Sequence, residues 1–116
     1  MTVYISPNPG KPQAYSIALR AAQILLTHDA KVLMQDTLQN DCSAMGVQYL
    51  PLEDCLRQTD VILTIGGDGT ILHEANRSLK YHKPILGINL GRCGFLATCE
   101  INEMEAKLAA VARGDF

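Results

Sequence analysis

An apolar run near the middle of the chain stops abruptly at a cluster of glycines. Residues 60–65 are rich in β-branched side chains, and residues 66–70 follow directly as Gly-Gly-Asp-Gly-Thr, with a helical pattern after them. Glycines at a strand-to-helix turn let the backbone approach a ligand closely, and the first N–H groups of the helix point toward that ligand. This feature predicts an α/β fold with a phosphate-binding turn at the end of a buried strand.

The carboxylate of Asp68 is unusual in a phosphate-binding turn, because it would repel a phosphate. Its chemistry suits a general base, an acceptor for a substrate hydroxyl or a metal partner. The structural alternative is a helix cap, a common place for Asp. Three glycines surround this one carboxylate, and a plain turn rarely needs so many, so the functional interpretation is favoured.

A second glycine loop follows the next predicted strand. Residues 84–88 read as that strand, and residues 89–96 follow as Asn-Leu-Gly-Arg-Cys-Gly-Phe-Leu. Ligands in open parallel sheets bind beyond the carboxyl ends of the strands. Both glycine loops are therefore expected at the same edge of one sheet.

Strand and helix patterns alternate along the whole chain, which indicates βαβ units and a parallel sheet. We expect an α/β fold of Rossmann-like, three-layer type with a mostly parallel sheet. In the helix predicted over 70–81, Leu79 is expected to face inward. The last helix is expected to begin with a capping box of Asn102 and Glu105 and to end before Gly114. The remaining predicted elements are strands at 3–6, 31–35 and 47–50, a helix with apolar positions from 14 to 25, and a short helix at 51–58.

Composition narrows the classes of function. The 116 residues suffice for one small domain with a core. A net charge of −2 and only 5% aromatic residues argue against a nucleic-acid or membrane surface. None of the four cysteines forms a C-x-x-C pair, which argues against a zinc site and favours buried thiols in a reducing compartment. We therefore expect a cytoplasmic protein.

Several charged residues invite functional interpretations that the sequence does not support well. Lys11 follows a glycine, but Pro12 comes next where a P-loop needs Ser or Thr, so a simple turn is expected. His28 and His82 lie near predicted helix ends and are read as structural. Arg77 and Arg92 are read mainly as surface residues, although Arg92 is a modest candidate for phosphate binding.

Together, the two glycine segments resemble a known family. Gly-Gly-Asp-Gly-Thr at 66–70 is similar to the motif of NAD kinases, of diacylglycerol and sphingosine kinases and, more loosely, of phosphofructokinases. The second loop, at 87–96, resembles the Asn-x-Gly-x-x-Gly-Phe-Leu pattern of bacterial NAD kinases, and the spacing of the two motifs fits as well. The resemblance is specific over residues 60–96 and weak elsewhere.

The resemblance implies a kinase that phosphorylates the 2′-hydroxyl of the adenosine ribose of NAD, with ATP or polyphosphate as donor and a divalent metal ion such as Mg²⁺. It implies that Asp68 accepts the hydroxyl proton. The resemblance further implies that Gly67 and Thr70 shape the phosphate-facing turn and that Gly69 touches the dinucleotide through its backbone. It also implies contacts to the nucleotide, or positions lining its pocket, for Leu72, His73 and Phe95. For His73 a structural role is about equally favoured. No residue is assigned as a metal ligand.

The family pattern also includes a second, β-rich domain with an Asn-Asp or Asn-Glu pair that grips the dinucleotide. Asn102-Glu103 matches that pair by letters but fits a helix start. We therefore expect residues 1–116 to be the amino-terminal domain alone, with the full-length protein a homo-oligomer, a dimer or tetramer. The alternatives are a lipid-kinase or phosphofructokinase-like domain and a non-catalytic nucleotide-binding or assembly module.

Overall fold

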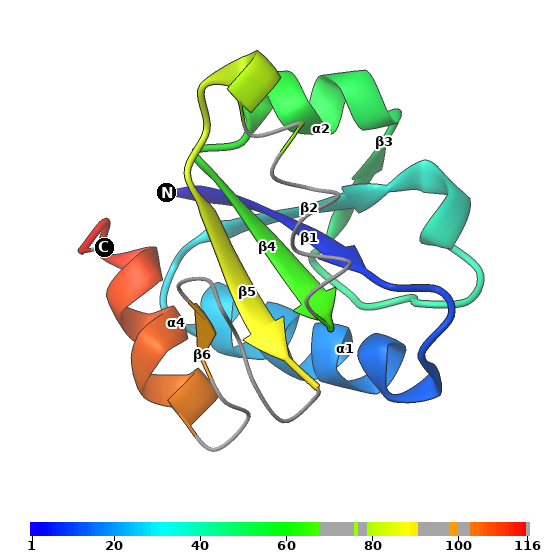
Figure 1. The fold of residues 1–116 in the computed structure, drawn as a ribbon, viewed down its shortest axis with the longest axis horizontal. Coiled ribbons are helices and arrows are strands. Elements are labelled where there is room, and N and C mark those ends of the chain that lie inside the picture. Colours follow the sequence, from blue (N-terminus) through cyan, green and yellow to red (C-terminus); the bar gives the residue numbers. More distant parts are fainter. Residues whose placement is uncertain (68–75, 77–78, 91–97, 100–102, 116) are drawn as a thin grey trace.

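A six-stranded sheet in the order β3-β2-β1-β4-β5-β6 forms the centre of the molecule (Figure 1). The computed structural model describes residues 1–67, 76, 79–90, 98–99 and 103–115. All five strand pairings are parallel. The strands are β1 (Thr2–Pro7), β2 (Lys31–Gln35), β3 (Gln48–Leu50), β4 (Val61–Gly66), β5 (Ile85–Asn89) and β6 (Thr98–Cys99). The α-helices are α1 (Pro12–Thr27), α2 (Leu52–Gln58) and α4 (Met104–Ala112), and a 3₁₀ turn, η1 (Asp36–Leu38), follows β2.

The chain reverses its direction across the sheet between β1 and β4. From β1 it moves outward to β2 and β3, then returns to place β4 beside β1 and continues to β5 and β6. This order is the dinucleotide-binding type of doubly wound fold, in which ligands bind at the carboxyl ends of the strands next to the reversal. The predicted Rossmann-like α/β fold is confirmed, and the reversal lies between the ends of β1 and β4.

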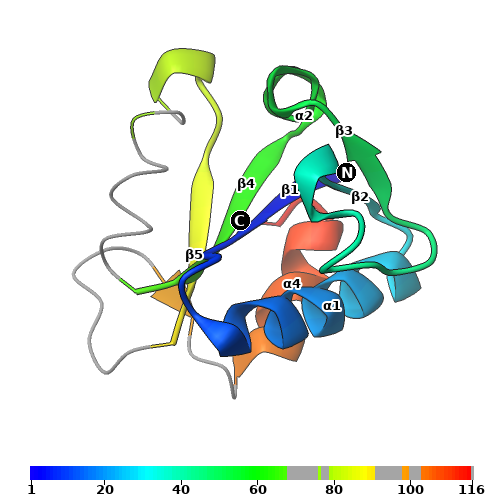
Figure 2. The same ribbon diagram turned by 90° about the vertical axis from the view of Figure 1, so that its right-hand side faces the viewer.

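One face of the sheet carries most of the core. Figure 2 shows α1 and α4 side by side against this face. Small residues on α1 let the helix pack closely on the β-branched residues of the central strands. The core beneath α1 and α4 includes the buried side chains of Ala14, Ala18, Ala21, Leu25, Val3, Ile5, Val61, Leu63, Ile65, Met104, Leu108 and Val111.

The opposite face carries a smaller apolar cluster, and α2 covers it. The buried members are Tyr4, Leu33, Cys55, Leu56 and Ile62, with Tyr81 and Ile85 partly buried against them. Because side chains alternate between the faces of a strand, the strand residues Tyr4, Leu33 and Ile62 occupy the positions between those of the larger core. All six residues of β4 are buried, as expected of a strand covered on both sides.

Two of the helices end in the same hydrogen-bonded motif. After α4, Gly114 has φ 77° and donates its N–H to Val111, and Asp115 donates to Ala110. Asp29 takes the equivalent position after α1. Its φ is 66°, and its N–H donates to the carbonyl of Leu26. The left-handed residue satisfies carbonyls that the helix end leaves free, and glycine adopts that conformation most easily. The predicted helix end at Gly114 is confirmed.

Three expectations about local structure need correction. Leu79 is 75% exposed instead of facing inward. Tyr81, two residues further along the same helical turn, packs on the smaller cluster, and residues two apart lie on different sides of a helix. The cap position before α4 is Glu103, with no side-chain capping bond, instead of the expected Asn102, which itself lies outside the described residues. Pro51 precedes α2 as its cap residue instead of starting the first turn.

Candidate functional site

The carboxyl ends of three neighbouring strands are tied together by backbone hydrogen bonds. Asn8, just past β1, donates its N–H to the carbonyl of Ile65 in β4 over 2.9 Å. Leu90, just past β5, donates to the carbonyl of Gly66 over 2.9 Å. The glycine turn therefore starts from a fixed frame formed by β1, β4 and β5, at the reversal of strand order.

Gly67 is the part of the predicted turn that this structure describes, and its surroundings are informative. Among the residues described, a Cβ atom built on Gly67 would meet no other atom within 4 Å, and its φ is not in the left-handed region. Neither backbone conformation nor crowding by the described residues therefore requires glycine here. A glycine at this place also allows the close approach of a ligand to the backbone.

The loop after β1 is a turn beside the same edge. The side-chain oxygen of Asn8 accepts the N–H of Gly10 at 2.9 Å, and the Asn8 carbonyl accepts the N–H of Lys11 at 3.1 Å. Such a side-chain turn is typical of Asn. The expectation of a simple turn at Lys11 is confirmed. The strand order additionally places this turn next to the end of β4, which the sequence alone did not indicate.

A row of small side chains lies in the sheet just below the glycine turn. Thr64 pairs in register with Ser6 on one side and with Gly87 on the other. Ile62, one pleat earlier on the same face, belongs to the cluster under α2. The face thus changes from large apolar residues to small and polar ones as the strands approach the candidate site.

Thr64 is a candidate site residue that the sequence reasoning missed. It is fully buried, and its Oγ1 atom has no hydrogen-bond partner among the residues described. Buried hydroxyls are normally paired. The signal in the sequence was a polar residue at matching positions of two apolar strands, Ser6 and Thr64, but only the strand order brings them together.

Most of the predicted site lies outside the described residues. Of the site residues that the resemblance implies, the structure describes Gly67 alone. The others lie outside the described residues: Asp68, Gly69, Thr70, Leu72, His73 and Phe95. The same holds for Arg77, for Arg92 and for most of the helix predicted over 70–81. The structure therefore places the frame of the turn and leaves those predictions untested.

Comparison with known proteins decides the family. The family model for the ATP-NAD kinase N-terminal domain matches residues 3–116. The chain belongs to the NAD kinase family. It is 36% identical over 115 residues to the NAD kinase of Heliobacterium modesticaldum, and this alignment covers 99% of this chain and 40% of that protein. It is 36% identical over 107 residues to the NAD kinase of Methanopyrus kandleri, covering 90% of this chain and 36% of that protein. The chain thus spans about two fifths of the length of the relatives that it matches.

Residues that could hold a divalent metal are not grouped in the part of this family member that the structure describes. Among the residues described, no three His, Cys, Asp or Glu side chains lie close enough together to bind a metal ion. The described residues therefore do not fit a metal site by themselves. None of the described helices is long and apolar enough to cross a bilayer.

The described thiols of this NAD kinase family domain are packing residues. Cys42 and Cys55 are both free and buried. Burial raises the pKa of the Cys55 thiol to about 11, and burial also raises the pKa of Cys42. Both thiols therefore remain protonated near neutral pH and are poor nucleophiles. This confirms the expectation of buried structural cysteines for these two positions.

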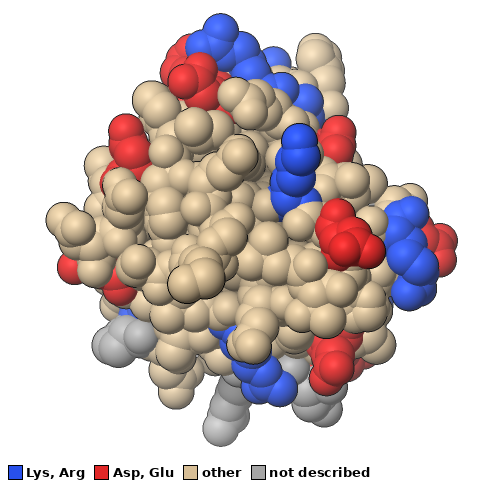
Figure 3. Space-filling model, turned by 180° about the vertical axis from the view of Figure 1, so that it is seen from behind, with Lys and Arg blue, Asp and Glu red and all other residues tan. Residues whose placement is uncertain are grey.

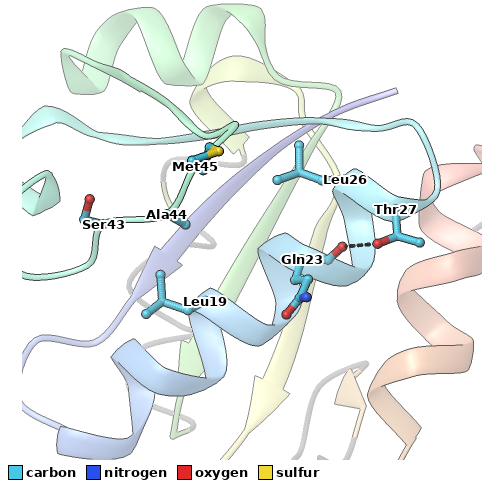
Figure 4. Close-up of a pocket in the computed structure, with 7 residues that line it drawn as sticks. All are labelled: Leu19, Gln23, Leu26, Thr27, Ser43, Ala44 and Met45. Carbon is cyan, nitrogen blue, oxygen red and sulfur yellow. Dashed lines mark hydrogen bonds between the residues drawn. The ribbon is translucent and has the colours of Figure 1, made fainter.

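A hollow of about 470 Å³ lies away from the glycine turn, between α1 and the loop before β3 (Figure 4). Its lining has no charged side chain: Leu19, Gln23, Leu26, Thr27, Ser43, Ala44 and Met45. On the face shown in Figure 3, acidic and basic side chains adjoin one another at the upper and right-hand edges, and uncharged residues cover most of the middle. The hollow has no charged side chain to bind the phosphates of a dinucleotide, so the edge beside Gly67 is the better candidate site.

Proposed function

We propose that this chain supplies one part of the active site of an enzyme that phosphorylates the 2′-hydroxyl of the adenosine ribose of NAD, giving NADP. ATP or polyphosphate is the donor. The observation that carries the proposal is the position of Gly67 at the reversal of strand order, where a Cβ atom would meet no other described atom within 4 Å, in a chain of the NAD kinase family. A glycine that the described residues do not crowd, at the edge where such folds bind dinucleotides, supports a nucleotide site.

The proposed chemistry centres on Asp68. Its carboxylate accepts the proton of the ribose 2′-hydroxyl while the hydroxyl oxygen forms a bond to the terminal phosphorus of the donor. The bond between that phosphorus and the bridging oxygen breaks, and ADP leaves when the donor is ATP. Phosphoryl transfer asks a protein mainly for positioning and charge stabilisation, plus a group that orients the attacking oxygen.

The neighbouring residues hold the nucleotide in this proposal. Gly67 and Thr70 shape the turn that faces the phosphates, and Gly69 touches the dinucleotide through its backbone. Leu72 and Phe95 line the pocket, and His73 contacts the substrate. The fixed backbone frame under the turn supports this arrangement, because preorganised N–H groups stabilise phosphate charge without a cost of rearrangement during the reaction.

The rest of the site comes from outside this chain in our proposal. The relatives are about two and a half times as long as the matched region, since 115 residues make up 40% of the first relative. We assign to the additional part a β-rich domain that closes over the dinucleotide. A divalent metal ion supplies charge neutralisation at the phosphates when bound. We also propose that the full-length enzyme is a cytoplasmic homo-oligomer. The two buried free thiols support the reducing compartment in this proposal.

The decisive test replaces Asp68 in a complete enzyme. The chain is joined to the carboxyl-terminal three fifths of the Heliobacterium modesticaldum relative, and NADP formation is measured. We expect Asp68→Asn to lower kcat by about 10²–10⁴-fold, the usual contribution of a well-placed general base, with NAD binding retained. A kcat within a few-fold of the parent would remove Asp68 from this role.

The chain alone gives a second test. One wall of a site cannot bury enough of a dinucleotide for tight binding. We expect no NADP formation by the 116-residue chain and NAD binding only in the millimolar range, about −4 kcal/mol. Micromolar binding in calorimetry would contradict the proposal that the site is shared.

A further inference from the structure

The four methionines of the chain differ sharply in their exposure to solvent. The side chains of Met34 in β2 and Met104 at the start of α4 are 0% exposed, whereas Met1 is 37% and Met45 is 97% exposed. Oxidation of methionine to its sulfoxide is a common modification, and a dissolved oxidant has to reach the sulfur atom. Access to solvent therefore distinguishes Met45 from the other three.

The loop that carries Met45 is held in place on both sides of this residue. Before it, the Tyr49 hydroxyl donates to the Cys42 carbonyl and accepts the N–H of Ala44 at 2.9 Å. After it, Gly46 has φ 91°, a conformation that glycine adopts most easily, and a Cβ atom there would lie 3.1 Å from a side chain of α1. These contacts fix the backbone around Met45, so its exposure belongs to the folded state.

Met45 also lines the uncharged hollow between α1 and the loop before β3 (Figure 4). The apolar part of the lining is formed by Met45 with Leu19, Leu26 and Ala44. A thioether is flexible and apolar, whereas its sulfoxide is polar. Oxidation of Met45 therefore changes the chemistry of this wall while the buried core stays as it is.

We propose that Met45 is a reversible oxidation site: peroxides convert its thioether to the sulfoxide, which the fold tolerates. The sulfur lone pair forms a bond to one oxygen of hydrogen peroxide, and the O–O bond breaks. The attacked oxygen passes its proton to the departing hydroxide, which leaves as water. The sulfur is thus oxidised by two electrons and the peroxide is reduced. The site is separate from the nucleotide edge and independent of the proposed kinase chemistry.

The buried methionines are expected to resist the same reagent. Met34 and Met104 belong to the larger core, and the oxidant reaches them only when the fold opens. Met1 is partly covered, since its terminal methyl group lies beside Gly114. The expected order of reaction is therefore Met45 first, Met1 second and the two core residues last.

The first test treats the 116-residue chain with dilute hydrogen peroxide and follows each sulfoxide by mass spectrometry of its peptides. We expect Met45 to react at least about tenfold faster than Met34 and Met104. The control variant Met45→Leu should lose the fast reaction and leave the rates at the other three positions unchanged. Equal rates at Met45 and at a core methionine would overturn the proposal.

The second test measures whether the sulfoxide is tolerated and can be reduced. The chain oxidised at Met45 alone should keep its Tm within about 3 °C of the parent, as for a surface substitution. The two methionine sulfoxide reductases, one for each sulfoxide epimer, should restore the parent mass. A larger fall in Tm, or a sulfoxide that resists both enzymes, would overturn the proposal. Either result leaves the proposed kinase function unaffected.

Discussion

Buried threonine hydroxyls at the two ends of β4 differ in their hydrogen bonding. At the amino end, Thr59 bonds to the backbone of β1 and of β4 itself, and Asp60 exchanges hydrogen bonds with Thr2 through its N–H and its carboxylate. At the carboxyl end, Thr64 is equally buried and has no partner among the residues described, and no other described atom lies within 4 Å of a Cβ built on Gly67. The same strand is closed at one end and incomplete at the other.

The difference separates what holds the fold from what serves the site. Backbone and side-chain groups at the amino end satisfy one another, which stabilises the start of β1 against β4. The carboxyl end is tied by backbone bonds up to Gly66, but its side chains are small or unpaired. Proteins keep local violations of good packing mainly where function requires them. The comparison therefore points to the carboxyl end as the binding edge without reference to any motif.

Within the comparison of the two ends of β4, the largest stability effect should follow from opening the closed end. Thr59→Val removes the acceptor for the Tyr4 N–H and the donor to the Val61 and Thr2 carbonyls. A buried N–H left unpaired costs about 1–3 kcal/mol, so we expect the free energy of unfolding to fall by about 2–3 kcal/mol. Urea denaturation measures this loss. A change below about 0.5 kcal/mol would mean that the two ends of β4 do not differ as described.

High pH should weaken the packing of α2 on the sheet through Cys55. This residue of α2 points its thiol at the carbonyls of Met34 and Leu50, and burial raises its pKa from 9.0 to about 11. The unfolded state therefore loses its thiol proton first as the pH rises, so the stabilisation is complete below about pH 9 and is lost as the pH approaches 11. We expect a loss of up to about 2 kcal/mol from this residue.

The control for the pH effect is Cys55→Ala. The cavity left by the shorter side chain lowers stability at every pH, but the difference between pH 9 and pH 11 should shrink relative to the parent chain. Chemical denaturation at a series of pH values gives both quantities. An unaltered pH slope in the variant would assign the effect to other groups.

A smaller effect distinguishes two kinds of glycine. Gly114→Ala places a side chain at φ 77°, 3.3 Å from the Met1 side chain, and should cost about 1 kcal/mol. Gly67→Ala meets open space at an ordinary φ and should leave the Tm within about 1 °C, while it weakens NAD binding by blocking the approach of the ligand. A large loss of stability in Gly67→Ala would show that the turn needs glycine for folding.

The sequence predicts the fold well because its signals are local and repeated. The span of β2 was predicted as Lys31–Gln35, and the apolar spacing along α1 matches its buried residues. Strand β5 begins at Ile85 instead of Pro84. The prediction for Leu79 is wrong because periodicity identifies an apolar stripe without showing where the stripe ends. At Tyr81 an aromatic residue takes the inward position instead.

The candidate site is only partly predictable from the sequence, for a different reason. Two glycine loops after strands predict a binding edge, and strand order confirms that the strands preceding them, β4 and β5, are neighbours. The place of the Asn8 turn beside the site and the unpaired Thr64 could not be found, because both depend on β1 lying beside β4. The ends of β1 and β4, at Pro7 and Gly66, are separated by about half of the chain, and no local pattern reports that pairing.

The smallest effect concerns Leu79, the residue that the sequence misplaces. Its side chain is 75% exposed, so it gains little from folding, and surface substitutions usually change stability by no more than about 0.5 kcal/mol. Leu79→Lys should therefore leave the free energy of unfolding nearly unchanged, whereas Leu33→Ala in the cluster under α2 should lower it by about 2–5 kcal/mol. Denaturation of the two variants in parallel checks both. A loss above about 1 kcal/mol in Leu79→Lys would show that this side chain is covered in solution, and light scattering over a concentration series would then tell whether a second copy of the chain covers it.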